Sequence, residues 1–95
     1  MNLEAAWLMT LEAARLYDAG EECGAQANSA KYLAAEAAYA SCQTAVMTHG
    51  GMGYSAEYHV ERYLRECPIP RIAPVSPQMI MNFIGEKVLG LPKSY

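Results

Sequence analysis

The sequence predicts an all-α helical bundle, and three observations lead to this fold class. Sixteen of the 95 residues are alanine, almost as many as the Leu, Ile, Val and Phe residues together. Apolar residues recur every three or four positions in several segments, as on the packed face of a helix. Charged residues make up 18% of the chain, below the usual share of about a quarter. Alanine-rich helices with so little charge are covered on most sides, so residues 1–95 are expected to form a single partial domain.

The first predicted helix covers residues 3–18. Its apolar residues follow helical spacing along one face: Leu3, Trp7, Leu11 and Ala14. Gly20 follows at the position where a glycine commonly ends a helix with a positive φ angle. Residues 18–24 are therefore expected to form a loop.

The second predicted helix, residues 26–48, carries almost no charge. Between Gln26 and His49 only Lys31 and Glu36 are charged. One stripe has a heptad-like spacing: Tyr32, Ala35, Tyr39, Cys42 and Val46. A second stripe is made of small residues that let another helix approach closely: Ala34, Ala38, Ser41 and Ala45. A two-helix hairpin cannot cover so many uncharged sides, so this helix needs a further partner.

Glycines and prolines divide the second half of the chain. Three glycines are expected to stop the second helix: Gly50, Gly51 and Gly53. A third helix is predicted over residues 56–67 and ends at Pro68. The prolines that follow are expected to keep residues 68–76 extended or turning.

The last predicted helix begins at Ser76 and Pro77, because serine is a favoured N-cap and proline fits the first helical position. It is expected to run to Val88 or Leu89 and to end at Gly90. One face of this helix is apolar: Ile80, Phe83, Ile84, Val88 and Leu91.

Composition and charge exclude several classes of protein. No run of about 18 apolar residues is present, so no membrane-spanning helix is expected, and the first residues lack the positive charge of a signal peptide. Seven basic residues against ten acidic ones, with no basic cluster, argue against nucleic-acid binding. The cysteines Cys23, Cys42 and Cys67 form neither a CxxC pair nor a zinc pattern. Reduced thiols in the cytoplasm are therefore expected.

The segment from His49 to Tyr54 is the first candidate binding site. Glycines at a helix end let backbone N–H groups approach a phosphate or a flat ring. The same glycines can also serve only as a helix stop and a tight turn, and composition alone favours that simpler interpretation. The segment lacks the lysine followed by Ser or Thr of a Walker phosphate loop.

The start of the last helix is the second candidate. Ser76, Gln78 and the positive end of the helix dipole attract an anion, although simple capping by Ser76 is favoured on composition alone. Glu57, His59 and Glu61 invite a metal site, but they alternate around a helix and cannot converge on one ion. We therefore expect no metal site there, but an exposed face with ion pairs.

These segments together resemble the C-terminal signature of acyl-CoA dehydrogenases. That signature reads GGxGY, then EYPVER and RD, and after a short gap IYEGTSEIQ. Residues 50–54 and 57–62 and the pair Arg65-Glu66 follow its first three blocks. Residues 12–16 and 30–38 look like the two helices that precede it, so the resemblance covers nearly the whole chain. The glycine and EYxVER blocks are fairly specific in combination, but neither is specific alone.

The resemblance implies a fold and a chemistry. Enzymes of this family are several times longer, with an N-terminal helical domain, a middle β-domain and a C-terminal four-helix bundle. The cofactor FAD lies between domains and across a subunit interface. This chain looks like the latter part of the bundle. The reaction is the α,β-dehydrogenation of an acyl-CoA thioester, in which a carboxylate removes the α-proton while hydride passes from Cβ to flavin N5.

The resemblance also assigns cofactor-binding residues by position. Gly50 and Gly51 match the glycines that approach the FAD of a neighbouring subunit. Ser76 and Gln78 match the polar residues after the family's Glu-Gly, which contact FAD at a helix start. The residue types at both sites, the glycine segment and the start of the last helix, also allow an anion to bind without reference to the family.

Two residues depart from the family pattern. Pro74 stands where many members carry the catalytic Glu, and proline cannot accept a proton. Some branches of the family place the base on another helix, which would lie upstream of this chain. Met47 replaces the family's Gln before the glycines, which is a contact to the cofactor. No catalytic residue is therefore assigned.

The first interpretation is a C-terminal portion of an FAD-dependent acyl-CoA dehydrogenase that packs subunits and forms part of the FAD wall. It implies an acyl-CoA substrate, a homodimer or homotetramer, and an isolated chain that is inactive and lacks bound FAD. The alternative is a free-standing helical oligomerisation module of the same fold, without flavin or catalysis. Pro74, Met47 and the initial methionine favour this alternative.

Overall fold

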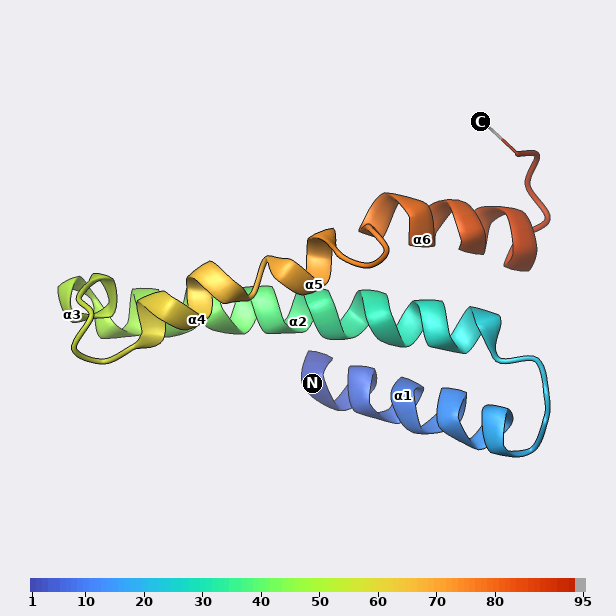
Figure 1. Cartoon of the computed structure of the whole chain (residues 1–95), viewed down its shortest axis with the longest axis horizontal. Helices are drawn as coiled ribbons and strands as arrows, with labels where there is room; N and C mark the ends of the chain where they lie inside the picture. The colour runs from blue at the N-terminus through green and yellow to red at the C-terminus, as the bar shows by residue number, and fades with distance from the viewer. Residues whose placement is uncertain (94–95) are drawn as a thin grey trace.

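One long helix, α2 (Gly24–His49), forms the centre of the computed structural model, which describes residues 1–93. Helix α1 (Asn2–Asp18) runs antiparallel along one side of α2, and shorter helices follow the other side (Figure 1). The shorter elements are α3 (Gly51–Tyr54), α4 (Val60–Glu66), α5 (Ile69–Ile72), α6 (Pro77–Phe83) and a π-helical segment, η1 (Ile84–Val88). The described residues contain no strand, which confirms the all-α helical fold.

The first helix ends as its glycine predicts. Gly20 has a φ angle of 72°, and its N–H donates to Tyr17 O over 3.0 Å. The N–H of Glu21 donates to Leu16 O over 2.9 Å. These two hydrogen bonds are those of a Schellman motif, so Gly20 stops α1 by local backbone geometry.

Helix α1 has two apolar faces rather than one. Ala6 and Leu16 are buried against the rest of the chain. The face predicted from spacing points elsewhere, because Leu3, Trp7 and Leu11 remain exposed, Trp7 by 58%. This exposed face is available to a partner outside the chain.

The heptad-like stripe of α2 faces the second half of the chain. Ala35 is buried, and Tyr39 lies beneath the guanidinium group of Arg71, 4.6 Å from its ring centre. The predicted stripe of small residues is not the one that this chain buries, since Ala34 and Ser41 are exposed. The small residues that are buried on α2 are Ala30, Ala35 and Ala37.

The glycines after α2 do more than stop it, which corrects the prediction. Gly50 ends α2 with a φ angle of 57°. Gly51 and Gly53, however, lie within the short helix α3, where the Gly53 N–H donates to Gly50 O over 2.9 Å. This turn packs closely on the end of α2, and glycine permits that approach because it has no Cβ.

The third predicted helix is shorter than expected. It begins at Val60 rather than at residue 56, because His59 has a φ angle of 61° and breaks the helical path. Ahead of it, Ser55 Oγ accepts a hydrogen bond from the Glu57 N–H over 3.4 Å, which is a local alternative to helical bonding.

The proline segment, expected to be extended or turning, also contains a short helix. Helix α5 (Ile69–Ile72) has Pro68 at its N-cap and Pro70 at its second position. Proline is tolerated there because the first-turn N–H groups of a helix have no intrahelical acceptor.

The last helix confirms its predicted start. Ser76 is the N-cap, and its Oγ accepts a hydrogen bond from the Met79 N–H over 3.4 Å. Ile80 is the most deeply buried residue on this helix, with 2% of its surface exposed. The helix widens into η1, where the Leu89 N–H donates to Ile84 O over 3.1 Å, and Gly90 ends it with a φ angle of 66°.

The chain exposes more surface than a lone domain of its size. Its accessible surface is 6772 Å², whereas a folded monomer of this mass is expected to expose about 5,400 Å². Its radius of gyration is 16.2 Å, compared with about 12 Å for a compact domain. The difference in area exceeds the roughly 800 Å² that one partner contributes to an ordinary protein interface.

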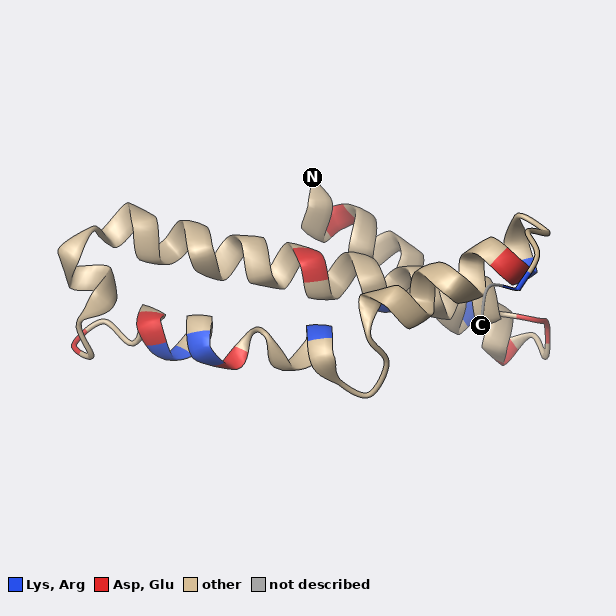
Figure 2. Cartoon of the chain, turned by 90° about the horizontal axis from the view of Figure 1, so that it is seen from above, with Lys and Arg blue, Asp and Glu red and all other residues tan. Residues whose placement is uncertain are grey.

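Charge is unevenly placed on this elongated shape. Figure 2 shows charged residues along α4 and α5, opposite a long uncharged stretch of α2. That stretch runs from residue 37 to residue 48 without Lys, Arg, Asp or Glu. Within residues 1–93, none of the helices combines the length and hydrophobicity needed to cross a membrane.

Candidate functional site

The first candidate site lies at the junction of α2 and α3. Gly50 and Gly51 are both exposed, and a Cβ added at either position would meet nothing within 4 Å. The positive φ angle of Gly50 explains its glycine. Gly51 has no such conformational or steric need within the chain. Its absent side chain leaves a strip of backbone open to a ligand or to another subunit.

Gly53 has a different role from its two neighbours. A Cβ at this position would lie 2.3 Å from Val46 O and 3.0 Å from His49 Cβ. Because a backbone oxygen cannot move aside easily, Gly53 is required by the packing of α3 on α2. The sequence alone did not separate this glycine from Gly50 and Gly51.

An aromatic contact lies beside these glycines, at the C-terminal end of α2. The rings of His49 and Tyr58 lie 5.6 Å apart at an angle of 53°, an arrangement that stabilises pairs of rings. Met47, at the position of the family's Gln, is exposed on this end of α2. It presents a thioether where the family presents an amide.

The second candidate site lies at the start of α6. Ser76 is half-buried and uses its hydroxyl oxygen to cap the helix, which confirms the capping interpretation. Gln78 is exposed, and its backbone N–H belongs to the first turn, where no intrahelical acceptor exists. A hollow of about 440 Å³ lies beside it, lined by Tyr32, Glu36, Arg71, Pro77, Gln78, Met81 and Asn82.

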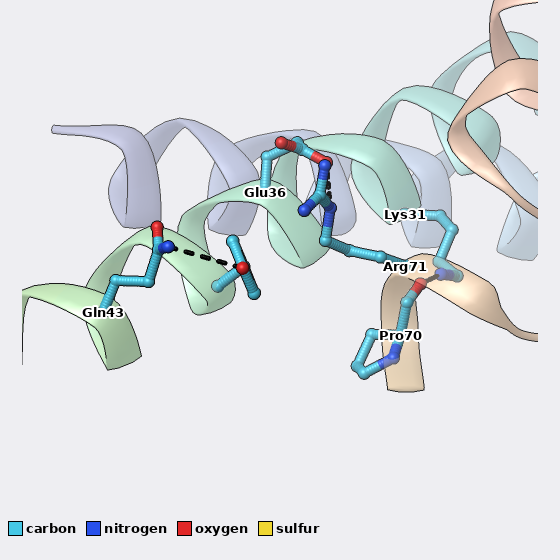
Figure 3. Close-up of polar contacts among 6 residues, drawn as sticks. Lys31, Glu36, Gln43, Pro70 and Arg71 are labelled. Atoms are coloured by element: carbon cyan, nitrogen blue, oxygen red, sulfur yellow. Dashed lines mark hydrogen bonds and ion pairs between the residues drawn. The ribbon is translucent and has the colours of Figure 1, made fainter. Parts of the chain in front are cut away.

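An ion-paired cluster holds this region against α2 (Figure 3). Arg71 Nε donates to Glu36 Oε1 over 2.8 Å, and its guanidinium group lies over the ring of Tyr39. Lys31 donates from Nζ to the carbonyl oxygen of Pro70. The two charged residues in the middle of α2 therefore both bind α5.

Sequence reasoning missed this cluster. The available signal was the isolation of Lys31 and Glu36 in an otherwise uncharged helix, because a charge on a covered helix usually has a partner. Arg71 pairs with Glu36 and so links α5 to the central helix α2.

The structure keeps the two candidate sites apart. Glu36 lines the hollow beside Gln78, and Gly50 follows the last turn of the same helix. At about 1.5 Å per residue, the path along α2 between Glu36 and Gly50 measures roughly 20 Å. The two sites therefore cannot hold one phosphate group between them.

Comparison with known proteins identifies the family. The sequence profile of the acyl-CoA dehydrogenase C-terminal domain matches residues 1–89. The chain belongs to the acyl-CoA dehydrogenase family. Acyl-CoA dehydrogenase FadE12 of Mycobacterium tuberculosis is 45% identical over the whole chain.

Other relatives carry different names within this family. The short/branched chain specific acyl-CoA dehydrogenase of Rattus norvegicus is 36% identical over 92% of the chain and 20% of its own length. The caffeyl-CoA reductase-Etf complex subunit CarC of Acetobacterium woodii is 43% identical over 93% of the chain and 23% of its own length. The match to FadE12 covers 25% of that protein. The chain thus spans between a fifth and a quarter of the length of these relatives.

Acyl-CoA dehydrogenases are generally FAD-dependent, and the residues at both candidate sites fit parts of that cofactor. FAD offers phosphate groups and flat rings. Gly50 and Gly51 provide open backbone for close approach, and Gln78 provides a backbone N–H and a side-chain amide at a helix start.

A catalytic base does not emerge from these residues. Pro74 is exposed in the loop between α5 and α6. Glu36 lines the nearby hollow, but its carboxylate is paired with Arg71. The structure therefore adds no candidate for the base to the sequence analysis.

The acidic and sulfur-containing side chains show no metal site. Among residues 1–93, no three His, Cys, Asp or Glu side chains are grouped so that they could hold a metal ion. Glu61 is paired with Arg65 on α4, as its spacing predicts. The three cysteines are free thiols.

Proposed function

We propose that this chain forms part of an FAD-dependent acyl-CoA dehydrogenase, in which it contributes to the wall of the FAD site and to the packing of subunits. The observation that carries the proposal is Gly51. Nothing within the chain requires a glycine there, and its open backbone lies at a position where the family approaches FAD. An acyl-CoA thioester is the implied substrate of the whole enzyme.

The two sites have separate roles in this proposal. Gln78 donates hydrogen bonds from the start of α6 to one cofactor, while Ser76 fixes the first turn by capping it. Gly50 and Gly51 lie roughly 20 Å away along α2 and face the cofactor of a neighbouring subunit. When bound, FAD supplies the hydride acceptor of the reaction.

The surface of the chain supports a role in packing. The exposed face of α1 carries large apolar side chains. A hollow of about 570 Å³ lies between the start of α1 and the C-terminal half of α2, and no Lys, Arg, Asp or Glu side chain lines it. Small residues line the α2 side of this hollow and would admit another helix: Ala37, Ala40, Ser41 and Ala45. A homodimer or homotetramer would cover such surfaces.

The three free cysteines support a location in a reducing compartment such as the cytoplasm, where thiols stay reduced.

Exchanging the matched segment of FadE12 for this chain tests the cofactor role. We expect this exchange protein to purify yellow, with about one FAD per subunit, and the isolated chain to purify colourless. In the exchange protein, Gly51→Val is expected to lower flavin content, because the added side chain occupies backbone surface that FAD approaches. Flavin absorbance per protein chain is the measurement.

The matched control is Gly85→Ala, a helical glycine whose added Cβ would make only an ordinary contact of 3.8 Å with Leu91. It is expected to leave the flavin content unchanged. A well-folded exchange protein that assembles but stays colourless would contradict the proposal and support the alternative, an oligomerisation module without flavin. The exposed surfaces of α1 and α2 are what favour that alternative.

The packing role makes a prediction for the isolated chain. We expect it to self-associate at tens of micromolar, the range where weak homodimers form, because the exposed face of α1 is apolar. Trp7→Glu is expected to shift it toward monomer, since it places a charge on that face. Sedimentation equilibrium measures both states.

The control for this prediction is Ala19→Glu, which adds the same charge at an exposed position beyond the end of α1. It is expected to associate like the unmodified chain. A folded monomer for the unmodified chain at these concentrations would rule out self-association through this face.

A further inference from the structure

Two contacts fix the register between α2 and the segment that returns along it. At one end, the ring of His49 lies 5.6 Å from that of Tyr58. Further along, the guanidinium group of Arg71 lies 4.6 Å from the ring centre of Tyr39. The two segments run antiparallel and side by side between these contacts (Figures 1 and 2).

This register brings Cys42 and Cys67 opposite each other. Cys42 lies three residues beyond Tyr39 on the covered stripe of α2. Cys67 lies four residues, about one turn, before Arg71. Because the two segments are antiparallel, both steps lead from the Tyr39–Arg71 contact toward His49. Cys42 and Cys67 therefore lie at about the same height along the axis of α2.

Burial and bonding agree with this placement. Cys67 is buried, with 8% of its surface exposed, whereas Cys42 is half-buried and can be reached from solvent. The Cys67 thiol donates to Leu64 O over 3.3 Å. Burial raises the pKa of the Cys67 thiol, and the neighbouring thiol of Cys42 raises it further.

We propose that Cys42 and Cys67 form a redox-active thiol pair that closes to an intramolecular disulfide and clips the α4–α5 segment to α2. The oxidant is a low-molecular-weight disulfide such as oxidised glutathione. The Cys42 thiolate attacks one sulfur of this oxidant, forms a mixed disulfide and releases one small thiol.

The second step completes the exchange. Cys67 loses its proton and attacks the Cys42 sulfur, which forms the protein disulfide and releases the second small thiol. Two protein thiols are oxidised and one small disulfide is reduced, so atoms and electrons balance. The loop that this disulfide closes, residues 42–67, includes the turn at residues 50–53.

Peptide mapping of the isolated chain tests this pairing directly. Trypsin cleaves after Lys and Arg, which places the three cysteines on separate peptides: 16–31, 32–62 and 66–71. After incubation at low micromolar concentration with oxidised glutathione, we expect residues 32–62 linked to 66–71, and a loss of about 2 Da from the intact mass. The remaining thiol is Cys23. Dithiothreitol is expected to reverse the link.

Variants and stability provide the controls. Cys23→Ala is expected to oxidise like the unmodified chain, whereas Cys42→Ala and Cys67→Ala are expected to lose the monomeric disulfide. Circular dichroism checks that each variant is folded. Oxidation is expected to raise Tm by about 5 °C or more, because a disulfide restricts the unfolded chain.

Three outcomes would overturn the proposal. One is a link that involves Cys23. Another is a disulfide between two chains at low concentration. The third is stable glutathione on Cys42 without closure onto Cys67. Since the unmodified chain alone gives the peptide map, the test does not depend on any variant folding.

Discussion

Replacing Gly53 with alanine is expected to destabilise the chain by about 2–4 kcal/mol. The added Cβ would lie 2.3 Å from Val46 O, closer than real contacts allow, and 3.0 Å from His49 Cβ. Val46 O belongs to the last turns of α2, so relief requires α3 to move away or α2 to fray. Urea unfolding followed by circular dichroism, at one protein concentration, measures the loss.

Gly51→Ala is the matched control for this prediction, because Gly51 is also a glycine of α3 but has open space around it. Alanine is a better helix former than glycine by roughly 1 kcal/mol. We therefore expect Gly51→Ala to keep or slightly raise the stability. Equal losses for the two variants would contradict the assignment of Gly53 as the packing glycine.

The three glycines also show where sequence reasoning reaches its limit. Their number at a helix end predicted a stop, and Gly50 provides it. Which glycine meets a neighbour depends on how closely α3 packs on α2, and that distance is not encoded in the local sequence. The sequence thus located the candidate site but could not distinguish Gly51, which is open, from Gly53, which is packed.

Elements with local end signals were predicted well. Helix α1 ends at a Schellman glycine, Gly20, and α6 starts at the Ser76 N-cap followed by Pro77. In each case the residues that stop or start the helix bond to their own neighbours, so a short stretch of sequence determines the result.

Elements without such signals were predicted poorly. The start of α4 depends on the positive φ angle of His59, a conformation that the residue type does not require. Helix α5 forms in a proline-rich stretch because Pro68 and Pro70 occupy positions that need no N–H. The Arg71–Glu36 pair spans 35 residues and depends on the register of two segments.

Pro74 leads to the second prediction with a large expected effect. We expect the exchange protein, with Pro74 in place, to dehydrogenate an acyl-CoA thioester. Proton removal needs one carboxylate within hydrogen-bond reach of the α-proton. Pro74 cannot supply it and Glu36 is paired with Arg71, so we expect the base on another helix upstream, as the resemblance to some branches of the family implies. Flavin bleaching by acyl-CoA under anaerobic conditions is the measurement.

Two substitutions locate the base in the exchange protein. Replacing the upstream carboxylate with its amide is expected to slow bleaching by about 10²–10⁴-fold, the usual contribution of a general base. Pro74→Ala is expected to bleach within about tenfold of the parent, because the proline side chain removes no proton. Flavin content, measured first in each protein, separates loss of cofactor from loss of the base.

The competing hypothesis is that Pro74 marks a copy of the fold that has lost catalysis. It predicts bound FAD without bleaching for every acyl chain length tried, and this result would exclude a base elsewhere. Pro74→Glu then becomes informative, since a carboxylate in the exposed loop before α6 would restore bleaching only if it reached the substrate. Because proline also fixes φ and removes an N–H at this position, recovery with Glu but not with Ala would assign the lost activity to the missing carboxylate rather than to a stiffened loop.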